Sequence, residues 1–288
     1  MRFKDVCLKR AAMPSLNNLL PSNAKLLLVG GGKMGLALLQ GWLSKGLPQD
    51  CVAVQEPHPS ADLLALGVKV NPENASAYRV IIIAVKPQMA EAVLPELSPV
   101  IDNDSLILSL MAGLPLLEIA RLCTHACSYV RTMPNTPSAI GQGITALFAA
   151  PTVNENSRHI ATALMGAVGE TVWLDEEDSI DAVTALSGSG PAYVFHLVEA
   201  MTNAGIALGL APDTATQLAR ATVKGSGAML GAQEGSAETL RRNVTSPGGT
   251  TAAALDVLMD NKKGLSELML RTMRAAHLRA KELASNVL

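Results

Sequence analysis

Hydrophobic and polar residues alternate along the first 175 residues in blocks that predict a regular succession of strands and helices. Short aliphatic runs predict strands, whereas longer stretches with apolar residues three or four positions apart predict helices. The expected strands cover 25–29, 51–55, 68–70, 79–85, 106–110, 128–133, 144–149 and 171–174. The expected helices cover 36–44, 62–66, 89–97, 116–122 and 156–168. Strands that alternate with helices predict a parallel, doubly wound α/β sheet of the Rossmann type.

The pattern changes at the acidic cluster 175–178, after which no strand-like run follows. Helical stretches are expected at 179–208, 212–232, 237–243, 251–261 and 266–284, rich in glycine and alanine. We therefore expect an α/β domain at 25–177 and an all-α domain at 178–288. Residues 1–24 are basic but lack the apolar run of a secretory signal, and are expected to form a disordered leader. The apolar helical surfaces predict completion by a second subunit, as a homodimer or an assembly of dimers.

Composition excludes several classes of function. The 288 residues carry a net charge of -2, which gives no electrostatic reason to expect nucleic acid or an anionic membrane as a partner. No apolar run reaches the roughly 18–20 residues that span a bilayer. The four cysteines form no C-x-x-C pair, which favours a reducing cytoplasm, and the group Cys123, His125 and Cys127 lacks a fourth metal ligand. We expect no metal.

A glycine motif follows the first expected strand and opens the first helix. Gly30, Gly32 and Gly35 match the G-x-G-x-x-G pattern of dinucleotide-binding folds. In that pattern the first glycine makes the turn, the second lets a pyrophosphate approach, and the third lets helix and strand pack. The motif predicts NAD(H) or NADP(H) as cofactor.

The choice between the two cofactors stays open at this stage. Glu56 ends the second expected strand, where an acid usually binds the ribose hydroxyls and repels a 2′-phosphate, which favours NAD. Gln55 or Ser60 could lie at the phosphate position instead, and His58 could assist a phosphate.

Two further segments end central strands at the edge where open α/β sheets bind ligands. They are Ala84-Val85-Lys86-Pro87 and Met111-Ala112-Gly113, which we expect to line the nicotinamide side.

The segment 243–251, N-V-T-S-P-G-G-T-T, precedes the helix expected at 251–261. The first turn of a helix carries unsatisfied N–H groups and roughly half a positive charge. Ser246, Gly248, Gly249 and Thr250 therefore predict a receptor for a small carboxylate or phosphate.

Several of these segments resemble the pyrroline-5-carboxylate reductase family. The most specific are "VTSPGGTTAAAL" at 244–255, "ALSGSGPAYVF" at 185–195 and "RTMPNTP" at 131–137, with "AVKP" at 84–87 in support. The resemblance runs from about Leu26 to Leu283. It implies a Rossmann domain, a helical dimerisation domain, and reduction of 1-pyrroline-5-carboxylate to L-proline, the last step of proline biosynthesis.

The resemblance also implies roles for individual residues. Cofactor contacts would come from Gly31, Gly32, Lys33, Met34, Asn74, Ala84 to Pro87, Met111 to Gly113 and Asn243. Glu177, Thr250 and Thr251 would lie at the substrate, and Thr251 is the expected proton donor to the ring nitrogen. The chain departs from the family in its leader, in Met111, and in Gln55-Glu56 at the position that selects NADP.

Two other functions remain as alternatives. A 3-hydroxy acid dehydrogenase shares the two-domain plan but normally needs a lysine in the interdomain helix, and 179–208 contains none. A non-enzymatic nucleotide-binding protein would bind the cofactor without turnover.

Overall fold

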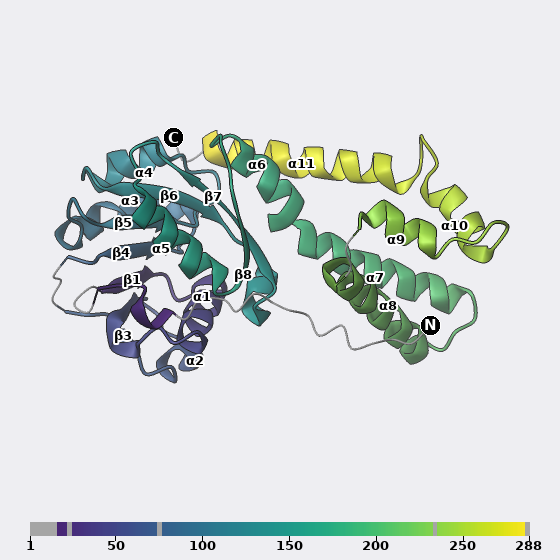
Figure 1. The fold of residues 1–288 in the computed structure, drawn as a ribbon, viewed down its shortest axis with the longest axis horizontal. Helices are drawn as coiled ribbons and strands as arrows, with labels where there is room; N and C mark the ends of the chain where they lie inside the picture. Colours follow the sequence, from purple (N-terminus) through teal and green to yellow (C-terminus); the bar gives the residue numbers. More distant parts are fainter. Residues whose placement is uncertain (1–15, 22–24, 74–76, 233–234, 286–288) are drawn as a thin grey trace. The chain divides into compact units, whose positions relative to one another are not determined.

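The structure is a computed structural model that describes residues 16–21, 25–73, 77–232 and 235–285. These residues form two compact units (Figure 1). One unit contains the sheet and comprises the described residues up to Ser189 together with those from 276 onward, and the other comprises 190–275. The division therefore falls after the expected boundary at 177/178.

In the described residues the first unit has one sheet of eight strands, in the order β3-β2-β1-β4-β5-β6-β7-β8. The first six positions of this order are those of a dinucleotide-binding sheet. The strands are β1 (Leu26–Val29), β2 (Val52–Gln55), β3 (Lys69–Val70), β4 (Val80–Ile83), β5 (Leu106–Ser109), β6 (Ser128–Met133), β7 (Gly143–Ala149) and β8 (Gly169–Trp173).

Helices cover both faces of this sheet, as the alternation of strands and helices predicts. Leu26 and Leu28 of β1 belong to one buried cluster, with α1 and α5, while Leu27 and Val29 belong to the other, with α3 and α4. Because β1 is buried on both faces, it reads as a continuous apolar run. The helices of this unit are α1 (Lys33–Ser44), α2 (Ala61–Leu64), α3 (Ala90–Val93), α4 (Leu116–Cys123), α5 (Glu155–Gly166) and α6 (Ser179–Val183).

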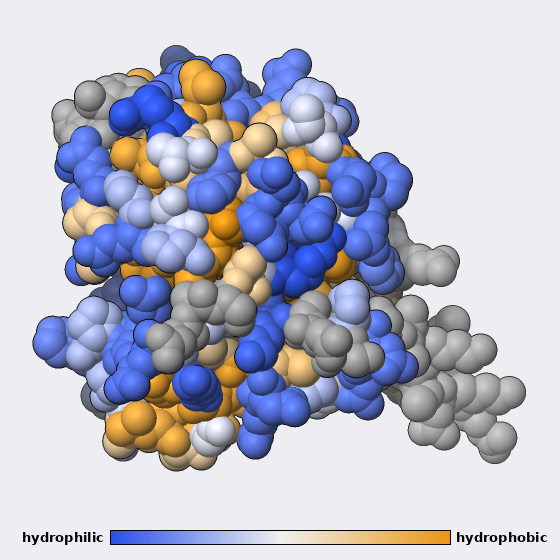
Figure 2. Space-filling model, turned by 90° about the vertical axis from the view of Figure 1, so that its left-hand side faces the viewer, coloured by the Kyte–Doolittle hydropathy of each residue, from blue (hydrophilic) through white to orange (hydrophobic). Residues whose placement is uncertain are grey.

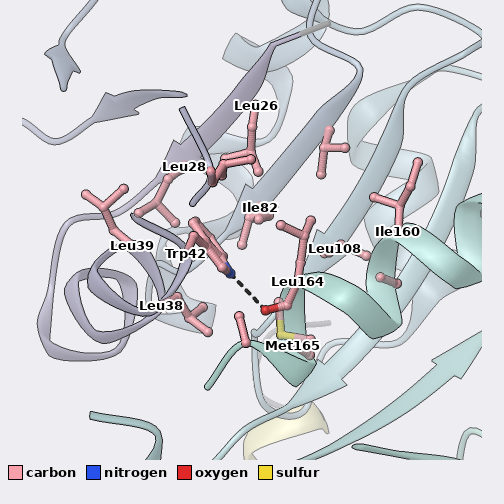
Figure 3. Close-up of a cluster of buried hydrophobic side chains, with 14 of the residues drawn as sticks. Leu26, Leu28, Leu38, Leu39, Trp42, Ile82, Leu108, Ile160, Leu164 and Met165 are labelled. Atoms are coloured by element: carbon pink, nitrogen blue, oxygen red, sulfur yellow. Dashed lines mark hydrogen bonds between the residues drawn. The ribbon is translucent and has the colours of Figure 1, made fainter. Parts of the chain in front are cut away.

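Trp42 anchors α1 in the first of these clusters (Figure 3). Its side chain is fully buried, and its indole Nε1–H donates to the carbonyl oxygen of Leu164 on α5 at 2.9 Å. The bond satisfies the one polar atom of the ring, so the ring's apolar area is buried without an unpaired donor. It also fixes α1, and with it the glycine loop, against the sheet.

Most expected elements are confirmed within two or three residues, but three differ. Strand β7 runs antiparallel to β6, so the sheet is not wholly parallel. Its connection to β6, residues 134–142, is shorter than the dozen or so residues that a parallel crossover needs. The helix expected at 89–97 is broken into α3 and 3-10 turns at Pro87–Met89 and Pro95–Val100, since proline interrupts the helical hydrogen bonds.

The third difference lies in the helix expected at 179–208. It is divided by a π turn at Thr184–Gly188 into α6 and α7 (Gly190–Ala207). A π turn of this kind often marks a functional segment.

Part of the expected disordered leader is ordered. Residues Leu16–Asn18 form a 3-10 turn, and the Leu16 side chain is buried in the same cluster as Trp42. The Leu16 N–H donates to the Lys45 carbonyl oxygen at 2.9 Å, just beyond the end of α1. Residues 1–15 and 22–24 of the leader lie outside the described residues.

The second unit consists of helices with little buried side-chain surface. They are α7, α8 (Pro212–Ala232), α9 (Ala237–Asn243), α10 (Thr250–Leu258) and most of α11 (Leu265–Ser285). In α8 the buried residues are the small Ala215 and Ala219, whereas Phe195 of α7 is 63% exposed and Val257 of α10 is 72% exposed. By contrast, the side of the sheet unit that Figure 2 shows is largely hydrophilic, with hydrophobic residues in small groups. The sheet unit thus buries its apolar side chains in its own core, whereas the helical unit leaves many of its apolar side chains exposed.

Candidate active site

The glycine loop between β1 and α1 has the shape that brings two strands and a helix into close contact. Gly30 has φ +102°, a conformation that side chains rarely adopt, and its N–H donates to the Gln55 carbonyl oxygen at 2.9 Å. A Cβ on Gly30 would lie 2.8 Å from the Ala84 carbonyl oxygen, and a Cβ on Gly35 would collide with the Gly30 carbonyl oxygen. Neither position therefore accepts a larger residue.

Gly32 differs from these two glycines, because a Cβ there would meet nothing within 4 Å. It has φ -67° and is the N-cap of α1, without a side-chain cap. The N–H groups of the first helical turn, which begins with Lys33 and Met34, lack intrahelical acceptors and border this open space, a geometry that favours an anion. A pyrophosphate group fits this loop, because Gly32 leaves the main chain open to close approach.

The other two predicted cofactor segments lie at the same sheet edge as the glycine loop. In the parallel register, Val29 pairs with Ile83, and Ile83 with Ser109. Ala84 N–H donates to the Val29 carbonyl oxygen at 2.7 Å, and Leu110 N–H donates to the Ile83 carbonyl oxygen at 2.9 Å. The segments 84–87 and 111–113 therefore follow directly from neighbouring strand ends. Of these residues, Ala84 and Val85 are half-buried, Lys86 is exposed, and Pro87 opens a 3-10 turn; Met111 and Gly113 are buried, with Ala112 half-buried.

Glu56 lies one residue beyond β2, beside the glycine loop. Its carboxylate Oε2 accepts the Gly31 N–H at 2.7 Å, and its Oε1 accepts the His58 N–H at 3.0 Å. The acid predicted at the ribose position is thus held against the loop itself. Asn74, another predicted cofactor residue, lies outside the described residues.

Glu177 joins three parts of the sheet unit. Its Oε1 accepts the Leu116 N–H, at the start of α4, at 2.7 Å, and the Arg131 Nη1–H, on β6, at 3.0 Å. The Arg131 side chain is 6% exposed and that of Glu177 is 25% exposed. Glu177 therefore braces the end of the loop that begins at Met111, a contact that nothing in the sequence predicts.

The predicted acid-binding segment lies in the helical unit, at the connection from α9 to α10. Asn243 is the last residue of α9, and Gly249 is the N-cap of α10, so Thr250 and Thr251 open its first turn. Gly249 N–H donates to the Ser246 carbonyl oxygen at 3.1 Å, which closes the turn, and Gly248 has φ +71°. Asn243, Ser246, Gly248, Thr250 and Thr251 are exposed, and Gly249 is half-buried. The main chain here forms a closed turn followed by a helix N-terminus with a glycine cap.

Three further residues hold this framework together, through partners that the sequence does not predict. Arg131 is the partner of Glu177. Asn135 accepts the Ile144 N–H at 3.0 Å and donates to the Ser187 carbonyl oxygen in the π turn at 3.2 Å. Asn71 binds both main-chain groups of Glu56. The motif around Arg131 and Asn135 marked them as notable, but only the fold shows which partners they have.

The cysteines near α4 are thiols with little tendency to ionise. Burial, with the nearby Cys127 as a second cause, raises the pKa of Cys123 to about 12, and burial also raises the pKa of Cys127. Both are free, as is Cys51.

In the described part of the chain, no group of three or more His, Cys, Asp and Glu side chains is placed to hold a metal ion. Nor does any described helix combine the length and apolarity needed to cross a bilayer.

Known proteins resemble this chain over nearly its whole length. A family described as pyrroline-5-carboxylate reductase dimerisation matches residues 177–283, and one described as NADP oxidoreductase, coenzyme F420-dependent, matches residues 25–113. The pyrroline-5-carboxylate reductase of Pseudomonas aeruginosa is 37% identical over 272 residues, which are 92% of this chain and 99% of that protein. The chain belongs to the pyrroline-5-carboxylate reductase family.

Solved structures of the family have the same fold. The pyrroline-5-carboxylate reductase of Coxiella burnetii is 37% identical, with a TM-score of 0.83 over 91% of this chain and 98% of that one. The Plasmodium falciparum pyrroline carboxylate reductase, solved with NADP bound, is 27% identical, with a TM-score of 0.77 over 91% of this chain and 98% of that one.

The brace formed by Glu177 leads to a test of stability. Glu177→Ala leaves the Arg131 guanidinium buried without its counter-charge, so we expect the free energy of unfolding to fall by about 3 kcal/mol. Urea denaturation at fixed protein concentration measures this change. The control is Glu176→Ala, which removes a neighbouring exposed carboxylate and should change stability by no more than about 0.5 kcal/mol. Equal stability of the two variants would contradict the bracing role.

Proposed function

We propose that this protein reduces 1-pyrroline-5-carboxylate to L-proline with NAD(P)H, the last step of proline biosynthesis. The observation that carries the proposal is the glycine loop at the carboxyl edge of β1 and β4, in a chain 37% identical to a pyrroline-5-carboxylate reductase over 92% of its length. The P. falciparum relative with bound NADP supports the cofactor class. The free thiols support a cytoplasmic location, which cell fractionation tests.

The cofactor would be held by the residues at the carboxyl edge of the sheet. Gly30 to Gly35 cradle the pyrophosphate, and Glu56 lies at the ribose position. Ala84 to Pro87 and Met111 to Gly113 line the nicotinamide side, with Asn243 and Asn74 as further contacts implied by the family. When bound, the reduced nicotinamide supplies the hydride that the imine carbon receives.

The substrate carboxylate would be bound at the start of α10. Ser246, Gly248, Gly249 and Thr250 surround the N-terminus of this nine-residue helix, whose first N–H groups lack intrahelical acceptors. A Cβ on Gly249 would lie 2.8 Å from Ser246 Oγ, so a side chain there would push into the hydroxyl that faces the turn. Glycine at this position keeps the anion site open.

A proton must reach the ring nitrogen, since an iminium accepts hydride far better than a neutral imine. Thr251 Oγ1, in the first turn of α10, is the proposed donor, relaying a proton from water. Orientation of two reactants contributes about 7–11 kcal/mol, whereas a general acid contributes about a hundredfold to ten-thousandfold in rate. Fixing the carboxylate is therefore the larger task of this chain, and a weak acid suffices for the proton.

Glu177 would combine two tasks. The family resemblance places it at the substrate, and its Oε1 already accepts hydrogen bonds from Leu116 and Arg131. We propose that these bonds hold the carboxylate and the loop after Met111 in one fixed arrangement.

The assembly would be a homodimer, or a larger assembly built from dimers, formed through the helical unit. Val194, Phe195 and Val198 of α7 line a groove with residues of α8, of about 1160 Å³. This groove and the exposed apolar residues of α10 favour a partner of the same kind, because so much apolar surface is rarely left in water. The matched family of dimerisation domains, at 177–283, supports the same assembly.

Light scattering at micromolar concentration tests the assembly. We expect the mass of a dimer or of a multiple of dimers, because the helical unit buries so little of its surface alone. A monomer of 30.0 kDa would contradict this proposal.

Parallel assays with NADH and NADPH test the reaction itself. With 1-pyrroline-5-carboxylate as acceptor, we expect oxidation of a reduced cofactor and an equal amount of proline. Cofactor binding without oxidation would instead support the nucleotide-binding alternative. Turnover of 3-hydroxy acids but not of the imine would support the dehydrogenase alternative.

Removal of the Thr251 hydroxyl tests the proposed proton donor. Thr251→Val keeps the size of the side chain, so we expect the fold to persist. The loss of transition-state stabilisation, obtained from the ratio of the kcat/KM values, should be about 1.5–3 kcal/mol, the value of a hydrogen bond to a charged group. The control is Thr272→Val on α11, which loses a hydroxyl bonded to the Leu268 carbonyl oxygen and should retain full kcat/KM. An unchanged kcat/KM in Thr251→Val would remove this residue from the mechanism.

A further inference from the structure

Glu56 is held in place more firmly than its position at the end of a strand requires. Besides the two hydrogen bonds to its carboxylate, the Asn71 side chain binds its main chain on both sides. Glu56 N–H donates to Asn71 Oδ1 at 2.8 Å, and Asn71 Nδ2 donates to the Glu56 carbonyl oxygen at 2.8 Å. Asn71 follows β3 with φ +49°, a conformation that asparagine tolerates better than most residues. The main chain of Glu56 is thus fixed to the neighbouring strand.

The side chain of Glu56 is fixed to the glycine loop from the other direction. Gly31 N–H donates to Oε2 at 2.7 Å, a short, charge-assisted bond. A Cβ on Gly31 would lie 2.7 Å from Leu63 Cδ2 and 3.2 Å from Glu56 Cγ, so a side chain there would press on Leu63 and on the acid. The carboxylate therefore accepts the hydrogen bond of the Gly31 N–H, and this N–H is then not available to a phosphate.

The segment that follows β2 offers no cation of its own to balance an added phosphate. From Glu56 to Val68 the sequence contains no lysine or arginine, and Asp62 adds a second negative charge. Ser60 Oγ accepts the Leu63 N–H at 3.2 Å as the cap of α2, so this position supplies a neutral hydroxyl and no positive charge. His58 is exposed, and its main-chain N–H is bound to Glu56. A carboxylate so placed attracts ribose hydroxyls and repels a 2′-phosphate.

We propose, on the basis of the reductase function proposed above, that Glu56 makes this protein select NADH over NADPH. Glu56 is the specificity-determining residue, and Asn71 positions it by holding its main chain. The selection arises from a fixed negative charge on the glycine loop, rather than from a lack of space for the phosphate.

Direct binding of the reduced cofactors tests this selection without any substrate. The fluorescence change of NADH and of NADPH on binding gives the two dissociation constants, with the thermal midpoint of each variant as a check on folding. For the wild-type protein we expect NADH to bind at least about tenfold more tightly than NADPH. Because repulsion is screened by salt, the NADPH affinity should rise relative to that of NADH between low and high ionic strength.

Glu56→Gln isolates the charge. Its side-chain oxygen still accepts the Gly31 N–H, so the loop keeps its shape while the negative charge is lost. We expect NADPH to bind at least about tenfold more tightly than it does to the wild type, with NADH unchanged or weaker. Asn71→Ala, which frees the main chain of Glu56, should reduce the preference for NADH. The matched control, Glu170→Gln, removes an exposed carboxylate on β8, at the other edge of the sheet, and should leave the preference as it is.

The possible outcomes separate this inference from the function on which it rests. A wild-type protein that binds NADPH as tightly as NADH, or a Glu56→Gln variant with the wild-type ratio of affinities, would overturn the role of Glu56. In either case cofactor binding, and with it the proposed reduction, would stand. Binding of neither cofactor would overturn both.

Discussion

The close approach of the main chain at the carboxyl ends of β1 and β4 is the constraint on which the sheet unit depends. Gly30 lies against the Ala84 carbonyl oxygen, where no side chain fits, and Gly35 lies against the Gly30 carbonyl oxygen in the same way. These contacts allow α1 to begin directly above the strand ends, with Trp42 bound to α5 at its far end. The N–H groups in the first turn of α1 have no side-chain cap, so the packing of the core and the proposed anion site have one cause.

The two anion sites that we propose, one in each unit, rest on the same physical device. Each presents a helix N-terminus with a glycine as its cap, Gly32 for α1 and Gly249 for α10, and neither cap has a side-chain hydrogen bond. Main-chain N–H groups without a competing side chain favour negative ligands. The two helix N-termini differ in the packing around them. The sheet unit has two large buried clusters, while the helical unit leaves apolar side chains exposed. This contrast is why an assembly is proposed for the second unit and not for the first.

The strands, the glycine loop and the helical second half could be predicted from the sequence because each depends on neighbouring residues. Apolar runs such as 80–83 predict buried strands wherever they occur. The antiparallel β7 could also have been found, since residues 134–142 are too few for a crossover. Pro95 likewise indicates the end of α3, because proline interrupts helical hydrogen bonds.

Contacts between distant residues could not be predicted in this way. The bonds from Glu177 to Arg131 and Leu116 join positions 46 and 61 residues apart. Asn71 reaches Glu56 across 15 residues because β2 and β3 pair side by side. Such partners depend on strand order, which a single sequence does not specify, so the sequence marked Glu56 and Glu177 as notable without showing what holds them.

The central claim is that the open space at Gly32 receives the pyrophosphate of the cofactor. The NADH affinity of the Gly32→Ala variant tests this claim most directly. A Cβ at this position meets nothing within 4 Å, and φ -67° suits alanine, so the protein itself should fold with unchanged stability. Because the methyl group would fill the space that a pyrophosphate needs, the account predicts a large loss of NADH binding in a folded protein. Wild-type affinity in that variant would contradict it.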